Sequence, residues 1–185
     1  MNQKYSLNNA WMKLAPVGQS FFEQLIHYCT TQGDQAENYA LEIKGADVNP
    51  ADKVGGAKIA KFIIGASNRD PIKARDFFAG HAIMLVGLGN GSAEGIDQVE
   101  LLRINNVVEK YFGDQSPRWD IQWLDLPTNS AKKILAIIVA PPRSEIQSIF
   151  PIVMVKESKM VRYACVHRGK RGWLTATILL NYLNN

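Results

Sequence analysis

The segment Glu37-Asn38-Tyr39-Ala40-Leu41-Glu42-Ile43-Lys44 has the pattern of a strand around which we expect the rest of the chain to be arranged. Less apolar residues alternate there with three apolar ones, Tyr39, Leu41 and Ile43. A period of two is typical of a half-buried strand, with the apolar side chains on the buried face. Because successive side chains of a strand point to opposite faces, Glu42 and Lys44 share the other face. The segment therefore predicts a strand that carries an acid and a lysine side by side.

This pair of side chains can be interpreted as part of a catalytic site or as an ordinary surface ion pair. A carboxylate can hold a divalent ion, and a lysine beside it can position a phosphate or an attacking water. Glu37 lies just before the strand, where a loop can bring it to the same ion. The alternative is a solvated strand face on which Glu42 and Lys44 form an ion pair worth about 0–1 kcal/mol. Both interpretations stay open at the level of this segment.

The composition is that of an ordinary globular protein. The chain has 185 residues, of which 46% are hydrophobic and 21% charged, which predicts one domain with a sizeable core. No apolar run approaches the ~18–20 residues of a membrane span, and the first residues lack the pattern of a secretory leader. Two cysteines, Cys29 and Cys165, provide no disulfide framework. We therefore expect a cytoplasmic protein with no membrane partner.

Positive charge is concentrated toward the end of the chain. From residue 130 onward, Glu145 and Glu157 oppose nine basic residues: Lys132, Lys133, Arg143, Lys156, Lys159, Arg162, Arg168, Lys170 and Arg171. A basic end on an otherwise balanced chain favours a polyanionic partner such as nucleic acid. The segment at 167–173 places three of these cations around two glycines, which suits a loop that contacts phosphates. An ordinary solvated loop is the alternative.

Helices and strands are mixed along the chain. We expect helices from about Ser20 to Cys29, with Ser20 as the N-cap, and at 53–68, 97–112 and 175–183. The helix at 53–68 carries Lys58 and Lys61 at its polar edge. Strands are expected at 81–87, 119–123, 132–139, 149–155 and 161–167. This order lacks the strict alternation of a parallel barrel and predicts an α+β (mixed α/β) fold, a mixed sheet flanked by helices.

Other chemical motifs are weaker. The glycine-rich segment at 87–95 lacks the Lys-Ser or Lys-Thr of a phosphate loop, so a plain strand exit is favoured over nucleotide binding. Cys29 with His27, and Cys165 with His167, have the residue types of a zinc site. Two residues two apart on a helix point in different directions, which favours unrelated single residues over a shared metal.

Read in order, several segments resemble the Schlafen AlbA-like domain family. They are Glu37-x-x-x-x-Glu42-Ile43-Lys44, Ala66-Ser67-Asn68-Arg69, the strand at 82–87 with its glycine-rich exit, residues 134–142, and Val166-His167-Arg168-Gly169-Lys170-Arg171. The order and spacing of these segments carry the resemblance. It implies a Schlafen AlbA-like domain at residues 37–185, after an N-terminal extension with a helix at residues 1–36.

The resemblance also implies a function. Members of this family bind nucleic acid, and some cleave RNA such as transfer RNA with a metal held by three carboxylates. By this resemblance Glu37 and Glu42 would hold Mg or Mn, and Lys44 would offset negative charge near the scissile phosphate. The third acid is missing after Val86-Gly87, where Asn90 is a weaker substitute. Nucleic-acid contacts would come from Lys58, Arg69, Arg168, Lys170 and Arg171.

The resemblance leaves a second function open. Without the third carboxylate, the chain can equally be a non-catalytic subunit that binds nucleic acid or a partner protein in a larger bacterial assembly, including anti-phage defence. Family members with two lobes clamp their substrate between them, so a homodimer is expected for a one-lobe chain. Binding of ATP is a third possible function, but it is less favoured than the other two because the sequence contains no lysine-bearing phosphate loop.

Overall fold

The computed structural model describes residues 9–89, 91–113, 116–126 and 131–142, together with the backbone of residues 152–156 and 159–163. The basic segment at 167–173, the helix expected at 175–183, and Asn90 all lie outside the described residues.

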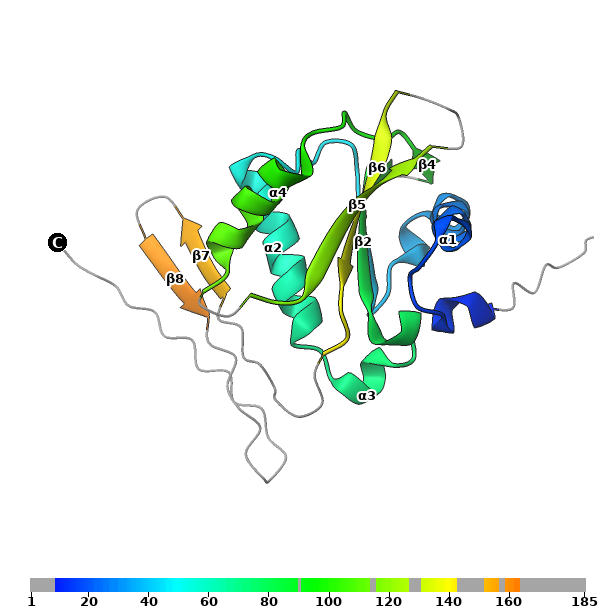
Figure 1. The fold of residues 1–185 in the computed structure, drawn as a ribbon, viewed down its shortest axis with the longest axis horizontal. Coiled ribbons are helices and arrows are strands. Elements are labelled where there is room, and N and C mark those ends of the chain that lie inside the picture. Colours follow the sequence, from blue (N-terminus) through cyan, green and yellow to red (C-terminus); the bar gives the residue numbers. More distant parts are fainter. Residues whose placement is uncertain are drawn as a thin grey trace, which may run out of the picture.

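A four-stranded mixed sheet forms the centre of the molecule (Figure 1). Its order is β1 (Leu41–Lys44), β2 (Ala82–Val86), β6 (Lys133–Val139) and β5 (Trp119–Asp125). β1 and β2 are parallel, whereas β2–β6 and β5–β6 are antiparallel. Helices lie on both faces of this sheet (Figure 1). The predicted α+β fold with a mixed sheet flanked by helices is therefore confirmed.

The two central strands are those with continuous apolar runs. Every residue of β2 is buried, and so are most residues of β6. A strand that is covered on both faces needs apolar side chains at every position, rather than at alternate ones. β5, at one edge of the sheet, is less buried. Ile121 is buried there, and Trp119 and Trp123 pack on the same side of the sheet as Ile121.

Helix α1 (Gln19–Gln32) covers one face of the sheet (Figure 1). Its buried residues form one core with strand residues of β1 and β2, among them Leu41, Ile83 and Leu85. An aromatic group made of Trp11, Phe21 and Phe78 closes this core. Residues before position 37 thus supply one side of the hydrophobic core, and a domain boundary at residue 37 stays a prediction.

The start of α1 differs from the expectation. The helix begins at Gln19, its N-cap is Gly18 with φ +80°, and no side chain caps it. Ser20 lies inside the helix, so its predicted role as the N-cap is wrong. The physical reason is that Gly18 reaches a positive φ without strain and turns the chain into the helix one residue earlier.

Helices α2 (Lys53–Ser67) and α4 (Leu101–Val108) cover the opposite face (Figure 1). Asp52 caps α2 by accepting a hydrogen bond from the Gly55 amide at 2.7 Å. A side chain at Gly56 would lie 2.2 Å from Val107, so this glycine lets α2 and α4 approach closely. The predicted helix at 53–68 is confirmed.

The helix expected at 97–112 is shorter in the structure. Helix α4 begins only at Leu101, and a 3-10 turn, Glu109–Tyr111, follows it. Residues 97–100 have no regular secondary structure, and Ile96, just before them, exchanges backbone hydrogen bonds with Lys133 of the sheet. The expected start at Asp97 was therefore wrong, because pairing with the sheet uses the backbone groups that a helix needs.

Short elements complete the described chain. The 3-10 turns are Asn9–Lys13, Gly33–Ala36 and Phe78–Gly80, and the short helix α3 spans Pro71–Ala74. The glycine-rich exit of β2 folds into a small hairpin of β3 (Leu88–Gly89) and β4 (Ser92–Ala93). A second hairpin, β7 (Ile152–Lys156) and β8 (Lys159–Tyr163), is antiparallel and lies beside α2 (Figure 1). In the part of the chain that is described, no helix has the length and apolarity needed to cross a bilayer.

Candidate nucleic-acid interface between β1 and α2

A cleft of about 770 Å³ lies between β1 and α2. Six charged residues line it: Glu37, Glu42, Lys44, Lys58, Lys61 and Arg69. Five of these six, all except Lys61, are predicted site residues. They are separated by up to 32 positions in the sequence, from Glu37 to Arg69. The cleft thus brings together every predicted site residue that the structure describes.

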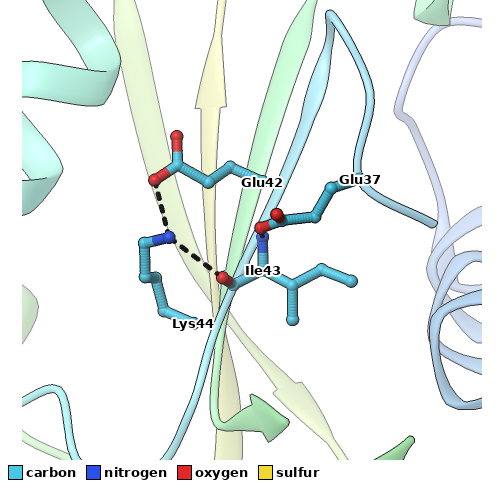
Figure 2. A network of polar contacts seen from close by, with 4 residues as sticks. All are labelled: Glu37, Glu42, Ile43 and Lys44. Carbon is cyan, nitrogen blue, oxygen red and sulfur yellow. Dashed lines mark hydrogen bonds and ion pairs between the residues drawn. The ribbon is translucent and has the colours of Figure 1, made fainter. Parts of the chain in front are cut away.

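The acid and the lysine of β1 form an ion pair. Glu42 Oε1 lies 2.8 Å from Lys44 Nζ, and both side chains are about one-third exposed (Figure 2). Both point toward α2, because Leu41 and Ile43 take the opposite face of β1 and pack against the α1 core. The predicted sharing of one strand face is confirmed. At this exposure the ion pair contributes about 0–1 kcal/mol to stability.

Glu37 lies at the open edge of β1 rather than on the face with Glu42. Its Oε1 accepts a hydrogen bond from the Ile43 amide at 2.8 Å (Figure 2). The Ile43 carbonyl accepts from Lys44 Nζ at 3.1 Å, and Leu41 exchanges backbone hydrogen bonds with Asn38. Each outward backbone group of Leu41 and Ile43 is therefore satisfied within the chain. Edge strands are often blocked in this way, which prevents another strand from pairing with them.

Tyr39 does not occupy the buried strand face that the alternation predicted. Its side chain is 45% exposed, and the strand begins only at Leu41. The reason is a turn at Asn38, whose Oδ1 accepts from the Ala40 amide at 2.9 Å. Tyr39 lines the cleft instead, where its hydroxyl accepts a hydrogen bond from the Asp70 amide at 3.1 Å.

Arg69 is held by internal contacts. Its Nε donates to the Ala66 carbonyl at 2.9 Å, and Nη2 donates to the Gly80 carbonyl at 2.8 Å. The guanidinium lies 5.5 Å from the centroid of the Tyr39 ring. Burial lowers the pKa of Arg69 from its usual value, and the interaction with Tyr39 acts in the opposite direction. Nη1 is buried with no hydrogen-bond partner among the described residues.

One face of α2 forms the other wall of the cleft. Lys58, Lys61 and Gly65 lie three and four residues apart, so they share that face. The two lysines are exposed, and neither forms an ion pair within the described part of the chain. A Cβ atom added at Gly65 would meet nothing within 4 Å, so packing does not require a glycine there.

The arrangement does not complete the carboxylate set of a metal-dependent nuclease. Within the described residues, no three His, Cys, Asp or Glu side chains gather as candidate metal ligands. Glu37 and Glu42 line the cleft, but each already accepts from a donor of β1. Glu94, within the glycine-rich exit, and Asp97, just after it, do not line this cleft. We therefore derive no metal-dependent step, and Mg or Mn binding stays a prediction.

Cys29 is a core residue. It is 2% exposed, and burial is the main cause that raises the pKa of its thiol to about 12. A thiol that stays protonated at neutral pH is neither a ready zinc ligand nor a nucleophile. This supports the interpretation of Cys29 as a single buried residue rather than as part of a zinc site with His27.

Comparison of the chain with models of protein families, with curated proteins and with solved structures gives no match. The resemblance to the Schlafen AlbA-like family therefore stays a prediction from the sequence. So do the roles of Arg168, Lys170, Arg171 and Asn90, which lie outside the described residues.

Among the lining residues that were not predicted as site candidates are Tyr39, Lys61 and Gly65. The spacing of Lys58, Lys61 and Gly65 on one helical face is a signal that the sequence contains. No sequence signal marks Tyr39, because the alternation of residues 39–44 predicts the opposite orientation.

Proposed function

We propose that this chain binds nucleic acid, RNA rather than DNA, through the cleft between β1 and α2, as a Schlafen AlbA-like domain would. The observation that supports this most is the charge of the cleft. Four cations line it against two carboxylates, and both carboxylates already accept from donors of β1. Lys58 and Lys61, exposed and without an ion pair among the described residues, are thus available to phosphates.

The carboxylates support RNA as the ligand. A carboxylate repels phosphates, but it accepts a hydrogen bond from a hydroxyl group. The ribose 2′-hydroxyl is the group that distinguishes RNA from DNA at a binding site. Glu42, beside Lys44 on the cleft face of β1, is placed to accept from it while the lysines of α2 contact the backbone.

Binding is tested with a labelled single-stranded RNA, by fluorescence anisotropy over a series of salt concentrations. The variant Lys58→Gln/Lys61→Gln should bind severalfold more weakly than wild type. Because each lost phosphate contact changes the log–log salt slope by about 0.7 for a single strand, the slope should become shallower by about 1.4. A DNA of the same sequence tests the preference for RNA.

The matched control is Lys53→Gln/Lys110→Gln. It removes the same charge from lysines that do not line the cleft. The control should bind RNA as wild type does. Equal losses in the two double variants would contradict a cleft-specific interface and indicate attraction by net charge alone.

Cleavage is measured in the same samples. The RNA is incubated with Mn²⁺, with and without chelator. Cleavage that occurs only without chelator and is lost in Glu42→Gln would indicate nuclease activity in the cleft. Intact RNA with unchanged binding in Glu42→Gln would restrict the function to binding. In that case the chain acts as a cytoplasmic nucleic-acid-binding subunit, as a homodimer or within a larger bacterial assembly.

A further inference from the structure

Tyr39 is the exposed aromatic residue of the cleft, and it is fixed in place. Its side chain is 45% exposed, its hydroxyl accepts from the Asp70 amide at 3.1 Å, and the Arg69 guanidinium lies 5.5 Å from its ring centroid. Arg69 is itself held by the carbonyls of Ala66 and Gly80. An exposed aromatic ring that is already ordered loses little further conformational entropy when a ligand stacks on it.

Core packing does not explain this ordering. Tyr39 is among the large hydrophobic side chains that remain exposed, and it is not a member of either hydrophobic core. Its contacts with Asp70 and Arg69 hold the ring at the wall of a cleft whose other wall carries Lys58 and Lys61. A fixed aromatic surface beside phosphate-binding cations is the combination that single-stranded nucleic acids use, with bases stacked on the ring and phosphates on the cations.

We infer that the cleft selects single-stranded RNA over duplex RNA by stacking an unpaired base on Tyr39. This inference rests on the proposed function. In a duplex the bases are already stacked on one another and are not free to reach the ring, whereas an unpaired base presents its face. The cleft volume of about 770 Å³ is in the range of sites that enclose small molecules, ~300–1,000 Å³, so it accommodates a short single-stranded segment.

The two contacts that hold the Tyr39 ring depend on different parts of the side chain. The hydrogen bond from Asp70 needs the tyrosine hydroxyl, whereas stacking on a base and the contact with Arg69 need only the aromatic ring. Tyr39→Phe therefore keeps the stacking surface. Tyr39→Leu keeps an apolar side chain but removes the ring.

The test measures the affinity of wild type, Tyr39→Phe and Tyr39→Leu for a single-stranded RNA of about ten nucleotides and for its duplex, within the site sizes of known single-strand binders. Wild type should prefer the single strand. Tyr39→Leu should lose about tenfold to a hundredfold on the single strand, the range of one lost base stack, with little change on the duplex. Tyr39→Phe should stay within a few-fold of wild type.

A base-free strand gives an independent measurement that needs no variant. Wild type should bind an abasic ribose-phosphate strand of the same length about tenfold to a hundredfold more weakly than it binds the base-containing strand. If Tyr39→Leu does not fold, as judged by its thermal unfolding, this comparison still decides the question.

The outcomes separate the two proposals. If wild type binds the single strand, the duplex and the abasic strand equally, stacking on Tyr39 is wrong while nucleic-acid binding stands. Stacking on Tyr39 is also wrong if Tyr39→Leu weakens binding of the single strand and of the duplex to the same degree. If wild type binds none of these ligands, the proposed function fails and the inference fails with it.

Discussion

At the scale of single residues, Arg69 shows how a cation in a basic cleft can serve the fold. Its side chain joins the end of α2 to the 3-10 turn at Phe78–Gly80 through hydrogen bonds to Ala66 and Gly80. That turn places Phe78, which is fully buried, at a φ of +46°. A backbone region that L-residues rarely adopt persists only where neighbouring contacts fix it.

We therefore expect Arg69→Met to destabilise the protein by about 2–4 kcal/mol, because two charged hydrogen bonds are lost and two carbonyls lose a donor. Arg103→Met is the control, since Arg103 is exposed on α4; it should change stability by less than about 0.5 kcal/mol. Urea unfolding measures both. Equal stability of Arg69→Met and wild type would show that the guanidinium is not a structural tie.

At the scale of elements, the edge of β1 is protected by side chains. Glu37 accepts from the Ile43 amide and Lys44 donates to the Ile43 carbonyl, so a short strand at the edge of the sheet carries its own blocking groups. The same two residues were predicted as catalytic from the sequence. Blocking a strand edge is a sufficient structural reason for an acid and a lysine at these positions.

Removing this protection should promote self-association. Glu37→Ala leaves the Ile43 amide without its acceptor and should lower stability by about 1 kcal/mol. It should also increase aggregation, which light scattering at a range of protein concentrations measures. Glu37→Gln keeps an acceptor oxygen at the same position and should behave as wild type. Aggregation of both variants to the same degree would point to charge, rather than to edge blocking, as the role of Glu37.

Helix α2 carries a glycine that its own stability does not require. Gly65 is exposed in the helix interior with open space around it, so Gly65→Ala should stabilise the protein by about 0.5–1 kcal/mol. The added methyl group would lie on the wall of the cleft, at a position between Lys61 and Arg69 in the sequence. If the RNA backbone approaches α2 there, the same variant should bind RNA more weakly despite being more stable.

Val54→Ala is the matched control for this prediction. Val54 lies in the same helix, is 66% exposed and does not line the cleft. Replacing a β-branched residue with alanine should also stabilise the helix, but without an effect on RNA affinity. Thermal unfolding and anisotropy on both variants separate the two effects. Unchanged affinity in Gly65→Ala would show that the ligand does not approach this part of α2.

At the scale of the whole molecule, the sheet needs a cover on both faces. Helix α1 supplies the cover on one face, and Leu25 at its centre is fully buried against the sheet core. A chain that begins at residue 37, where the sequence places the start of the domain, lacks this layer. We expect such a chain to remain unfolded, because β1, β2 and β6 would expose a whole apolar face to water.

A milder change tests the same point within the full chain. Leu25→Ala should destabilise the protein by about 2–5 kcal/mol, the range for a buried leucine. Leu14→Ala is the control, because Leu14 is 59% exposed and should change stability by less than about 0.5 kcal/mol. Circular dichroism on the shortened chain and urea unfolding of the two variants measure these effects. A folded, cooperative 37–185 chain would show that α1 is dispensable.

Much of the fold was predictable because it depends on local patterns. The continuous apolar runs of β2 and β6 indicated central strands, and the helical period at 53–68 indicated α2. The alternation in β1 correctly placed Glu42 and Lys44 on one face. The start of α4 was not predictable, because pairing of Ile96 with Lys133 across the sheet decides it.

The class of fold, the central strands and the basic residues available to a ligand can be predicted from the sequence, because hydrophobic periodicity and charge are properties of short segments. Which of these residues meet depends on the tertiary structure. It placed Lys58 and Lys61 opposite Glu42 and moved Glu37 to the strand edge. It also turned Tyr39 out of the core toward Arg69. Such choices depend on turns and on contacts between distant segments, and the period of a single strand does not contain them.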